Sequence, residues 1–375
     1  MLRWAIITGE YPPQPGGVSD YTRLVARGLA EAGDEVHVWA PECPQPAPPD
    51  PGVEVHRLSG RFGPRALITL DRALDRNAFD RILVQYVPHA FGWKAMNVPF
   101  CLWLASRRLD SIWVMFHEVA FPCSPRQSPK HNLLGLTTHF MARIMARAAQ
   151  RIFVSTRAWE PLLRRPAASE PQRVIWLPVP SNLPVKVSDT AIAAARSRAS
   201  AEKIVGHFGS FGPHVVSILN AALPPLLMAD RGRAGMLLGH GSQRFARELA
   251  LAYPQLSGRV ISMDGVSTDT LAAHMAACDL LVQPYPDGVT SRRTSLIAGL
   301  ALGLPIVTTM GPLTETLWEK SEAVVLAAAS SSAALVGAAE ALLVDNARRA
   351  MLGARAAALY RSHFAIEHTL RELRV

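Results

Sequence analysis

The sequence has few lysines, few cysteines and no long hydrophobic run. Of its 39 basic residues five are lysines and 34 are arginines. The four cysteines form no CxxC pair and have no zinc-finger spacing, which excludes a disulfide scaffold and a zinc finger. No apolar stretch reaches the roughly 20 residues of a membrane-spanning helix. The opening MLRWAIITGEYPP lacks the outline of a secretory signal, so we expect a cytoplasmic protein.

The composition is that of a globular protein with an excess of positive charge. Hydrophobic residues make up 49% of the 375 residues, charged residues 18%, and the net charge is +9. This length is natural for two domains. The arginines favour an anionic substrate or surface, although a compositional bias alone accounts for such an excess. Basic and aromatic residues are not interleaved, so nucleic-acid binding is not expected.

Short apolar runs alternate with helical patterns along the chain. Strands expected at 4–8 and 35–40 flank a helix expected at about 20–32, which is a βαβ unit and indicates a parallel sheet. The alternation pauses at a proline-rich linker, residues 177–188, and restarts at a strand expected at 203–208.

This order predicts an α/β protein with two doubly wound, Rossmann-like domains. We expect an acceptor-side domain at 1–182, a nucleotide-binding domain at 189–350, and a segment at 351–375 that packs back toward the first domain. Ligands of such sheets bind outside the carboxyl ends of the strands, and the cleft between the two domains is the expected site.

Two stretches of the first domain carry candidate site residues. Gly16 and Gly17 lie between the first strand and the first helix, where a ligand can approach the backbone and a helix start favours anions. The loop is not GxGxxG, so a nicotinamide fingerprint is absent. His117 and Glu118 follow the strand expected at 112–116, and a histidine there can bind a hydroxyl or steady developing charge.

Two stretches of the second domain carry candidate phosphate-binding residues. Gly209, Ser210 and Phe211 follow its first strand and can wrap a pyrophosphate with backbone amides. The stretch DGVTSRRTSLIAGLALGLPIVTT, residues 287–309, opens a helix with hydroxyls and two arginines. We expect the hydroxyls to cap this helix and the arginines to contact phosphate oxygens. The candidate donor-binding residues in this stretch are Thr290, Ser291, Arg292, Arg293, Thr294 and Ser295.

Two long stretches resemble a known family. EYPPQPGGVSDYTRLVARGLAEAGDEVHVWAP looks like the opening of the family-4 retaining glycosyltransferases of the GT-B fold, and CDLLVQPYPDGVTSRRTSLIAGLALGLPIVTT resembles their donor-site signature. The resemblance implies a nucleotide-diphosphate sugar as donor, UDP- or GDP-linked, and transfer with retention without a metal or further cofactor. It also implies a glycan or lipid-linked acceptor in cell-surface glycan, polysaccharide or glycolipid synthesis.

The resemblance also assigns roles to residues. Gly16, Gly17 and Gly265 join the donor-binding set, His117 is a catalytic candidate, and Tyr21 and Glu118 are acceptor-binding candidates.

The chain departs from the family at its donor signature. The family usually has Glu-x7-Glu, and its two positions fall here at Thr290 and Ala298, while Asp287 and Ser295 keep the spacing three residues earlier. The Arg and Lys that usually clamp the diphosphate are missing after the strand at 203–208. We hypothesise that Arg292 and Arg293 supply this charge. Asp287, the second catalytic candidate, would take over a contact to the sugar.

Other functions remain open at this point. A catalytically inactive GT-B homologue that binds nucleotide or scaffolds a partner transferase fits the missing glutamates. A sugar-nucleotide epimerase needs paired carboxylates, and only Glu118 and Asp287 are available. The basic amphipathic segment 131–151 favours peripheral attachment to the inner face of a membrane, although a core-packed helix with a solvated basic face fits the same pattern.

Overall fold

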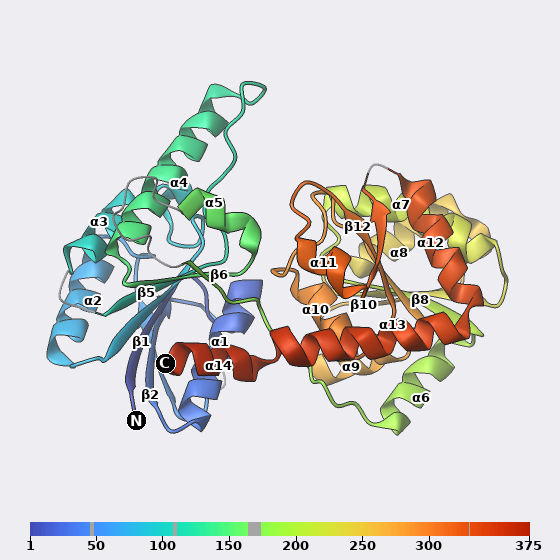
Figure 1. The fold of residues 1–375 in the computed structure, drawn as a ribbon, viewed down its shortest axis with the longest axis horizontal. Coiled ribbons are helices and arrows are strands. Elements are labelled where there is room, and N and C mark those ends of the chain that lie inside the picture. The colour runs from blue at the N-terminus through green and yellow to red at the C-terminus, as the bar shows by residue number, and fades with distance from the viewer. Residues whose placement is uncertain (46–48, 108–110, 164–173, 330) are drawn as a thin grey trace. The chain divides into compact units, whose positions relative to one another are not determined.

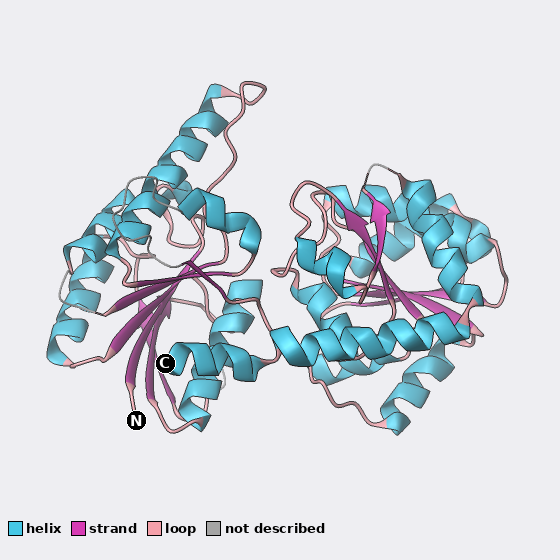
Figure 2. Ribbon diagram, in the orientation of Figure 1, coloured by secondary structure: helices cyan, strands magenta, loops and turns pink. Residues whose placement is uncertain are grey.

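The computed structural model describes residues 1–45, 49–107, 111–163, 174–329 and 331–375 (Figure 1). This part of the chain forms two compact units, Met1–Pro178 with Ile366–Val375, and Val179–Ala365. Each unit is a parallel β-sheet with helices on both faces (Figure 2). The α/β class and the two Rossmann-like domains predicted from the sequence are confirmed.

The first unit contains a seven-stranded sheet in the order β3-β2-β1-β4-β5-β6-β7. Its strands are β1 (Arg3–Thr8), β2 (Glu35–Pro41), β3 (Val53–Leu58), β4 (Arg81–Tyr86), β5 (Ile112–Phe116), β6 (Arg151–Val154) and β7 (Val174–Trp176). Its helices are α1 (Gly17–Glu31), α2 (Pro64–Arg76), η1 (Trp93–Ala95), α3 (Val98–Ser106), α4 (Pro129–Ala148), η2 (Arg157–Trp159), α5 (Glu160–Leu163) and α14 (Ile366–Arg374). The strand order changes direction between β1 and β4, so the topological switch point lies there.

The second unit contains a six-stranded sheet in the order β10-β9-β8-β11-β12-β13, with its switch point between β8 and β11. Its strands are β8 (Lys203–Phe208), β9 (Arg233–Leu238), β10 (Val260–Met263), β11 (Leu280–Gln283), β12 (Ile306–Met310) and β13 (Val325–Ala328). Its helices are α6 (Asp189–Ala199), α7 (Pro213–Met228), α8 (Ser242–Ala252), η3 (Pro254–Leu256), α9 (Thr268–Ala276), α10 (Thr294–Ala301), α11 (Thr316–Ser321), α12 (Ser332–Val344), α13 (Asn346–Leu359) and η4 (Tyr360–Phe364).

The central strands of both sheets are apolar on both faces because helices cover them on each side. All five residues of β5 (IWVMF) and all four of β11 (LLVQ) are buried. Such continuous apolar runs are why these strands were predictable as buried parallel β.

The observed boundaries differ from the predicted ones in a few places. Helix α4 begins at Pro129, two residues before the amphipathic segment predicted at 131–151, because Ser128 caps it by accepting a hydrogen bond from the amide of His131. The first compact unit ends at Pro178, and residues 351–365 group with the second unit instead of the first.

The final helix packs on the first unit. Helix α14 contacts α1, where a Cβ at Gly28 would lie 2.7 Å from Leu370 Cδ1, so the glycine allows the close approach. Arg374 Nε lies 3.1 Å from Asp34 Oδ2 and ties the end of α14 to the turn after α1. Among the described helices, none is both long and apolar enough to cross a membrane.

Candidate functional site

The start of α1 in the first unit is capped by an acidic side chain of its own. Glu10 Oε1 accepts hydrogen bonds from the amides of Val18 and Ser19, each at 3.1 Å. A Cβ at Gly16 would lie 2.3 Å from this carboxylate oxygen, whereas a Cβ at Gly17 would meet nothing within 4 Å. Gly16 therefore makes room for Glu10. The carboxylate of Glu10 thus occupies the helix start, where an anionic ligand was expected to bind. The donor-binding role of Gly16 and Gly17 stays a prediction, and the helix start no longer supports it.

His117 lies at the carboxyl end of β5, as predicted, and is buried. Its Nε2 lies 2.9 Å from Gln85 Oε1, and its ring contacts the ring of Tyr21 edge-on at 4.7 Å. Burial lowers the pKa of His117 to about 3, so the imidazole is neutral at pH 7. With Nε2 donating to Gln85, the neutral ring presents Nδ1 as an acceptor for a hydroxyl.

The two acceptor-binding candidates differ in their surroundings. Glu118 is partly exposed, and its Oε2 lies 3.8 Å from Nδ1 of His89, which follows β4. Tyr21 is buried, and burial raises the pKa of its phenol. Tyr21 therefore supports the His117 ring, and direct contact of either residue with an acceptor stays a prediction.

The second unit gathers polar groups at its switch point. Gly209 follows β8, and a Cβ at this position would lie 3.6 Å from Ser295 Oγ and 3.8 Å from His207 Nε2. Ser295 Oγ lies 2.9 Å from the hydroxyl of Tyr285, and the Arg293 guanidinium lies 4.7 Å from the centre of the Tyr285 ring. We call these five residues, His207, Gly209, Tyr285, Arg293 and Ser295, the switch-point cluster. Its members come from the carboxyl ends of β8 and β11 and the start of α10, the region where ligands of such sheets bind.

Several buried polar atoms at this edge of the sheet have no hydrogen-bond partner among the described residues. They are His207 Nε2, both amide atoms of Gln283 and Thr290 Oγ1. The other ring nitrogen of His207, Nδ1, donates to the carbonyl of Val282 at 2.8 Å. Burial lowers the pKa of His207 to about 4, so Nε2 of the neutral ring is an acceptor. Unsatisfied buried groups are costly, and a polar ligand that reached His207 Nε2 beside Gly209 would supply its partner.

The loop before α10 is held by a buried carboxylate that the sequence did not single out. Glu315, which follows β12, accepts hydrogen bonds from the Ser291 amide at 2.5 Å, the Ser291 hydroxyl at 2.7 Å and Trp318 Nε1 at 3.2 Å. Both the amide and the hydroxyl of Ser291 therefore bond to Glu315, a residue of the protein itself. Helix α10 has Arg293 as its N-cap and no side-chain cap, so the prediction that hydroxyls cap this helix is wrong. Ser291 and Ser295 are engaged by Glu315 and Tyr285 instead.

The glycine loop after β8 is partly used by the fold. The amide of Gly209 donates to Leu238 O at 3.0 Å, and that of Phe211 donates to His240 O at 3.1 Å. The Phe211 side chain belongs to the hydrophobic core. These two amides are therefore not available to wrap a pyrophosphate, and of the predicted trio Ser210 alone is exposed.

A pocket of about 360 Å³ lies beside this loop. It is lined by Ser210, Phe211, Gly212, His240, Gly241 and Arg244. Arg244, on α8, brings a positive charge to this pocket that the sequence stretches had not indicated. No short motif surrounds it, which is why reasoning from the sequence missed it.

Asp287 and Gly265 occupy outer positions. Asp287 is exposed in the turn before Gly288, a glycine with φ +91 where a Cβ would lie 2.2 Å from Thr314 Oγ1. Gly265 is exposed after β10, and Arg292 and Thr294 are half-buried. The two family glutamate positions, Thr290 and Ala298, are fully buried, so neither presents a side chain at the surface.

Two family models match the chain, one in each unit. A glycosyl transferase 4-like domain matches residues 16–180, and the glycosyl transferases group 1 model matches residues 202–345. None of the curated proteins matches the sequence.

Several solved structures share the fold over nearly the whole chain. A sucrose-phosphate synthase from Thermosynechococcus elongatus is 18% identical with a TM-score of 0.77, covering 100% of this chain and 97% of that one. HepE from Anabaena in complex with UDP and glucose is 17% identical with a TM-score of 0.69, covering 100% and 98%. WaaG, a glycosyltransferase involved in lipopolysaccharide biosynthesis, is 17% identical with a TM-score of 0.66, covering 94% of each chain. With both family models in sequence order and this fold, the chain belongs to the group 1 glycosyltransferases with a family-4-like N-terminal domain.

Proposed function

We propose that this glycosyltransferase moves a hexosyl group with retention from a nucleoside-diphosphate sugar to an acceptor hydroxyl, without a metal ion. The observation that carries the proposal is the switch-point cluster with its unsatisfied buried polar atoms. Helix α10 starts there without a side-chain cap, and Arg293 brings a positive charge to the same place. A helix start and a guanidinium together favour a diphosphate.

A uridine diphosphate is the donor class that we favour over a guanosine diphosphate. The structurally similar HepE was solved with UDP-glucose, at 17% identity and a TM-score of 0.67. The sugar would contact the cluster through its hydroxyls, because the neutral His207 Nε2 accepts a hydrogen bond. The exposed carboxylate of Asp287 is a further acceptor for a sugar hydroxyl.

The reaction requires little acid–base chemistry from side chains. The bond between the sugar C1 and the diphosphate oxygen breaks, and the acceptor oxygen bonds to C1 on the same face. The acceptor proton passes to the departing diphosphate oxygen. The protein holds the diphosphate by electrostatic contacts and orients the acceptor, the two contributions that this route needs. In the first unit we assign His117 to accept a hydrogen bond from a substrate hydroxyl, which the Nδ1 of its neutral ring allows.

The test is a thermal-shift series with UDP, GDP, ADP, TDP and CDP, followed by turnover of the matching sugar nucleotides with and without EDTA. A ligand that binds the folded form alone raises the melting temperature. We expect a selective shift with UDP, slow EDTA-resistant release of UDP from its sugar conjugate, and an α-linked product from an α-linked donor. A shift without release or transfer would favour the inactive scaffold instead. No shift with any diphosphate would overturn the donor site.

Peripheral attachment to an anionic membrane is the second part of the proposal. Leu133, Leu136 and Phe140 on α4 are 61%, 64% and 50% exposed, and Arg143 and Arg147 are exposed at the continuing helical spacing. We call these five residues the α4 stripe. Residues 119–159 contain no aspartate or glutamate, so no acidic side chain from this segment offsets the arginines.

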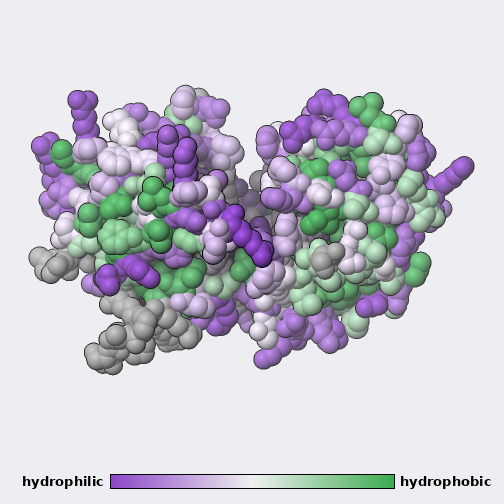
Figure 3. Space-filling view, turned by 90° about the horizontal axis from the view of Figure 1, so that it is seen from above, coloured by the Kyte–Doolittle hydropathy of each residue, from purple (hydrophilic) through white to green (hydrophobic). Residues whose placement is uncertain are grey.

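The α4 stripe combines apolar contact with charge. Figure 3 shows hydrophobic side chains exposed among hydrophilic ones on the first unit, at the left of the view. Apolar side chains that enter the lipid interface and arginines that meet headgroups are the pattern of interfacial helices. A lipid-linked acceptor would suit this attachment. Co-sedimentation with phosphatidylglycerol vesicles should be lost in Leu133→Ser/Leu136→Ser, while equal binding to neutral phosphatidylcholine vesicles would contradict the role of the arginines.

A further inference from the structure

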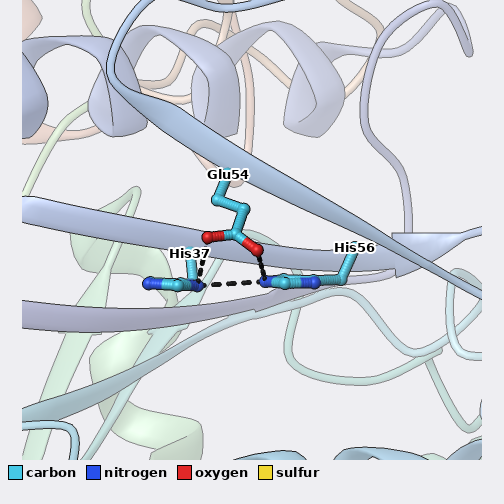
Figure 4. Close-up of side chains that lie close together, drawn as sticks. All are labelled: His37, Glu54 and His56. Atoms are coloured by element: carbon cyan, nitrogen blue, oxygen red, sulfur yellow. Dashed lines mark hydrogen bonds and ion pairs between the residues drawn. The ribbon is translucent and has the colours of Figure 1, made fainter. Parts of the chain in front are cut away.

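A cluster of histidine and carboxylate side chains lies on the edge of the first sheet, apart from the groups described so far. In the parallel pairing of β2 with β3, His37 lies opposite Glu54, and Trp39 lies opposite His56. Paired residues, and residues two apart on a strand, share one face of a sheet. His37, Glu54 and His56 therefore converge, as Figure 4 shows, with the two imidazole rings end to end, a nitrogen of each pointing at the other, and the Glu54 carboxylate beside both nitrogens.

The three possible ligand atoms are spaced as a metal ion requires. His37 Nδ1 lies 3.0 Å from His56 Nε2 and 3.5 Å from Glu54 Oε2, and His56 Nε2 lies 3.4 Å from Glu54 Oε1. Ligands at about 2.0–2.1 Å from a tetrahedral zinc ion lie about 3.3 Å apart. The three atoms have the spacing of one face of such a tetrahedron, and the two rings, whose nitrogens now point at each other, would turn toward the ion when it binds.

A fourth residue orients the buried histidine. The other ring nitrogen of His37, Nε2, lies 2.9 Å from Glu35 Oε1. This hydrogen bond keeps the proton on Nε2, so the lone pair of Nδ1 points into the cluster. Histidines that bind metal ions are commonly held by a carboxylate in this way. Glu35 is itself held by Arg3, whose Nε and Nη2 donate to the two carboxylate oxygens at 2.9 Å each. The positive charge of Arg3 is thus paired with Glu35.

Aromatic packing keeps the rings in place. The ring of Trp39 stacks on that of His56 with centroids 4.6 Å apart, and Phe79 contacts His37 edge-on at 5.2 Å. The outer side of the cluster is open, because the side chain of Glu54 is 64% exposed and that of His56 is 32% exposed. An ion could enter from solvent and keep a water molecule as its fourth ligand.

We propose that His37, Glu54 and His56 bind a divalent transition-metal ion, for which Zn²⁺ fits best. Two imidazole nitrogens and one carboxylate oxygen suit zinc, whereas Mg²⁺ and Ca²⁺ prefer oxygen ligands. The ion would join the edge strand β3 to β2, and so stabilise the first unit. The site lies in the middle of the strands and not at their carboxyl ends, so its role is structural and independent of donor binding.

The chain offers a direct experiment. Full-length protein without an affinity tag, freed of metal with EDTA, is titrated with Zn²⁺ by calorimetry, and with Co²⁺ by visible absorption. We expect one equivalent of Zn²⁺, the intense absorption bands of tetrahedral Co²⁺, and a higher melting temperature. No stoichiometric binding would overturn the proposal, and the cluster would then be a hydrogen-bonded histidine pair.

Matched variants locate the ion. His37→Gln and His56→Gln should each abolish stoichiometric binding, and Glu35→Gln should weaken it by about 10–100-fold because it orients His37. Glu54→Gln changes an exposed side chain, so it tests the site even where a histidine variant fails to fold. His131→Gln, at an exposed histidine on α4, should leave Zn²⁺ affinity unchanged. Binding that survives both histidine variants would place the ion elsewhere and overturn the assignment.

Discussion

The two units have the same strand order around their switch points, but different side chains bind the backbone near a helix start there, at α1 after β1 in the first unit and at α10 after β11 in the second. In the first unit Glu10 satisfies the amides at the start of α1, and Gly16 leaves room for its carboxylate. In the second unit α10 starts without a side-chain cap, beside Arg293 and the unsatisfied Nε2 of His207. A helix start attracts an anion, and a carboxylate of the protein occupies that position in the first unit.

The comparison teaches that a glycine-rich βα loop is not by itself an anion site. What matters is whether the chain supplies its own anion. The first unit does so with Glu10 at the start of α1, whereas in the second unit the carboxylate of Glu315 binds Ser291 in the loop before α10. Four expected effects of substitution test this contrast.

The largest expected effect is that of removing the buried carboxylate in the second unit. Glu315→Ala would leave the Ser291 amide and Trp318 Nε1 buried without their acceptor, at a cost of about 3 kcal/mol in the free energy of unfolding. UDP binding should also weaken, because the loop before α10 loses its anchor. Urea unfolding and calorimetry measure the two effects. Wild-type stability in this variant would show that Glu315 does not hold the loop.

The second effect is a pH dependence from His207. Its folded-state pKa of about 4 lies below the ordinary value of 6.5, so between these values the unfolded state binds more protons. The stabilisation is complete above pH 6.5 and is lost as the pH falls toward 4, at up to about 1.4 kcal/mol per pH unit. His207→Asn should flatten the stability curve of the second unit in this range, as measured by calorimetry.

The control for the pH dependence is His240→Asn. The side chain of His240 is 94% exposed, so its removal should leave the slope unchanged. If the His207 variant and the wild type lose stability in parallel between pH 6.5 and 4, His207 is not buried as a neutral ring.

The third effect concerns the positive charge for the diphosphate. Arg293→Ala and Arg244→Ala should each weaken UDP binding by about 10-fold, since a charge-assisted hydrogen bond is worth about 1.5–3 kcal/mol and solvent replaces part of it. Arg231→Ala removes an exposed charge before the amino end of β9 and should have no effect. Titration calorimetry at constant salt compares the three, and equal affinities would contradict the placement of the donor site.

The smallest effect is expected in the first unit. Glu10→Ala removes the cap of α1 and should lower the stability of that unit by about 1 kcal/mol. UDP affinity should not change, because the capped helix start is not the donor site. A marked loss of UDP affinity would remove the contrast between the two units.

The architecture was predictable because it depends on short-range patterns. Apolar runs such as Ile112–Phe116, alternating with helical periodicity, predict a doubly wound sheet whatever the surrounding loops do. The position of His117 after a strand was predictable for the same reason, since the carboxyl end of a strand is defined by the sequence that follows it.

The site was predictable only in part. Ser295 and Arg293 belong to a readable motif and do lie in the switch-point cluster. His207, Tyr285 and Glu315 were missed, because each resembles an ordinary core or loop residue until its neighbours are known. The prediction that hydroxyls cap α10 was wrong, because the hydroxyl of Ser291 bonds instead to Glu315, 24 residues later in the chain. No local pattern contains that contact.

The sequence by itself determined two parallel α/β units, the boundaries of β1, β2, β5 and β8 to within one residue, and the family to which they belong, whereas β7 was missed. Periodicity and turn residues carry that information over short distances. Only the tertiary structure decided that Glu10 caps α1 and that Glu315 binds Ser291, which amides after Gly209 are used by the fold, and that His37, Glu54 and His56 meet. These outcomes depend on contacts between residues far apart in the chain. Packing and competition for hydrogen bonds decide which of several possible partners meet, and the local sequence does not show which.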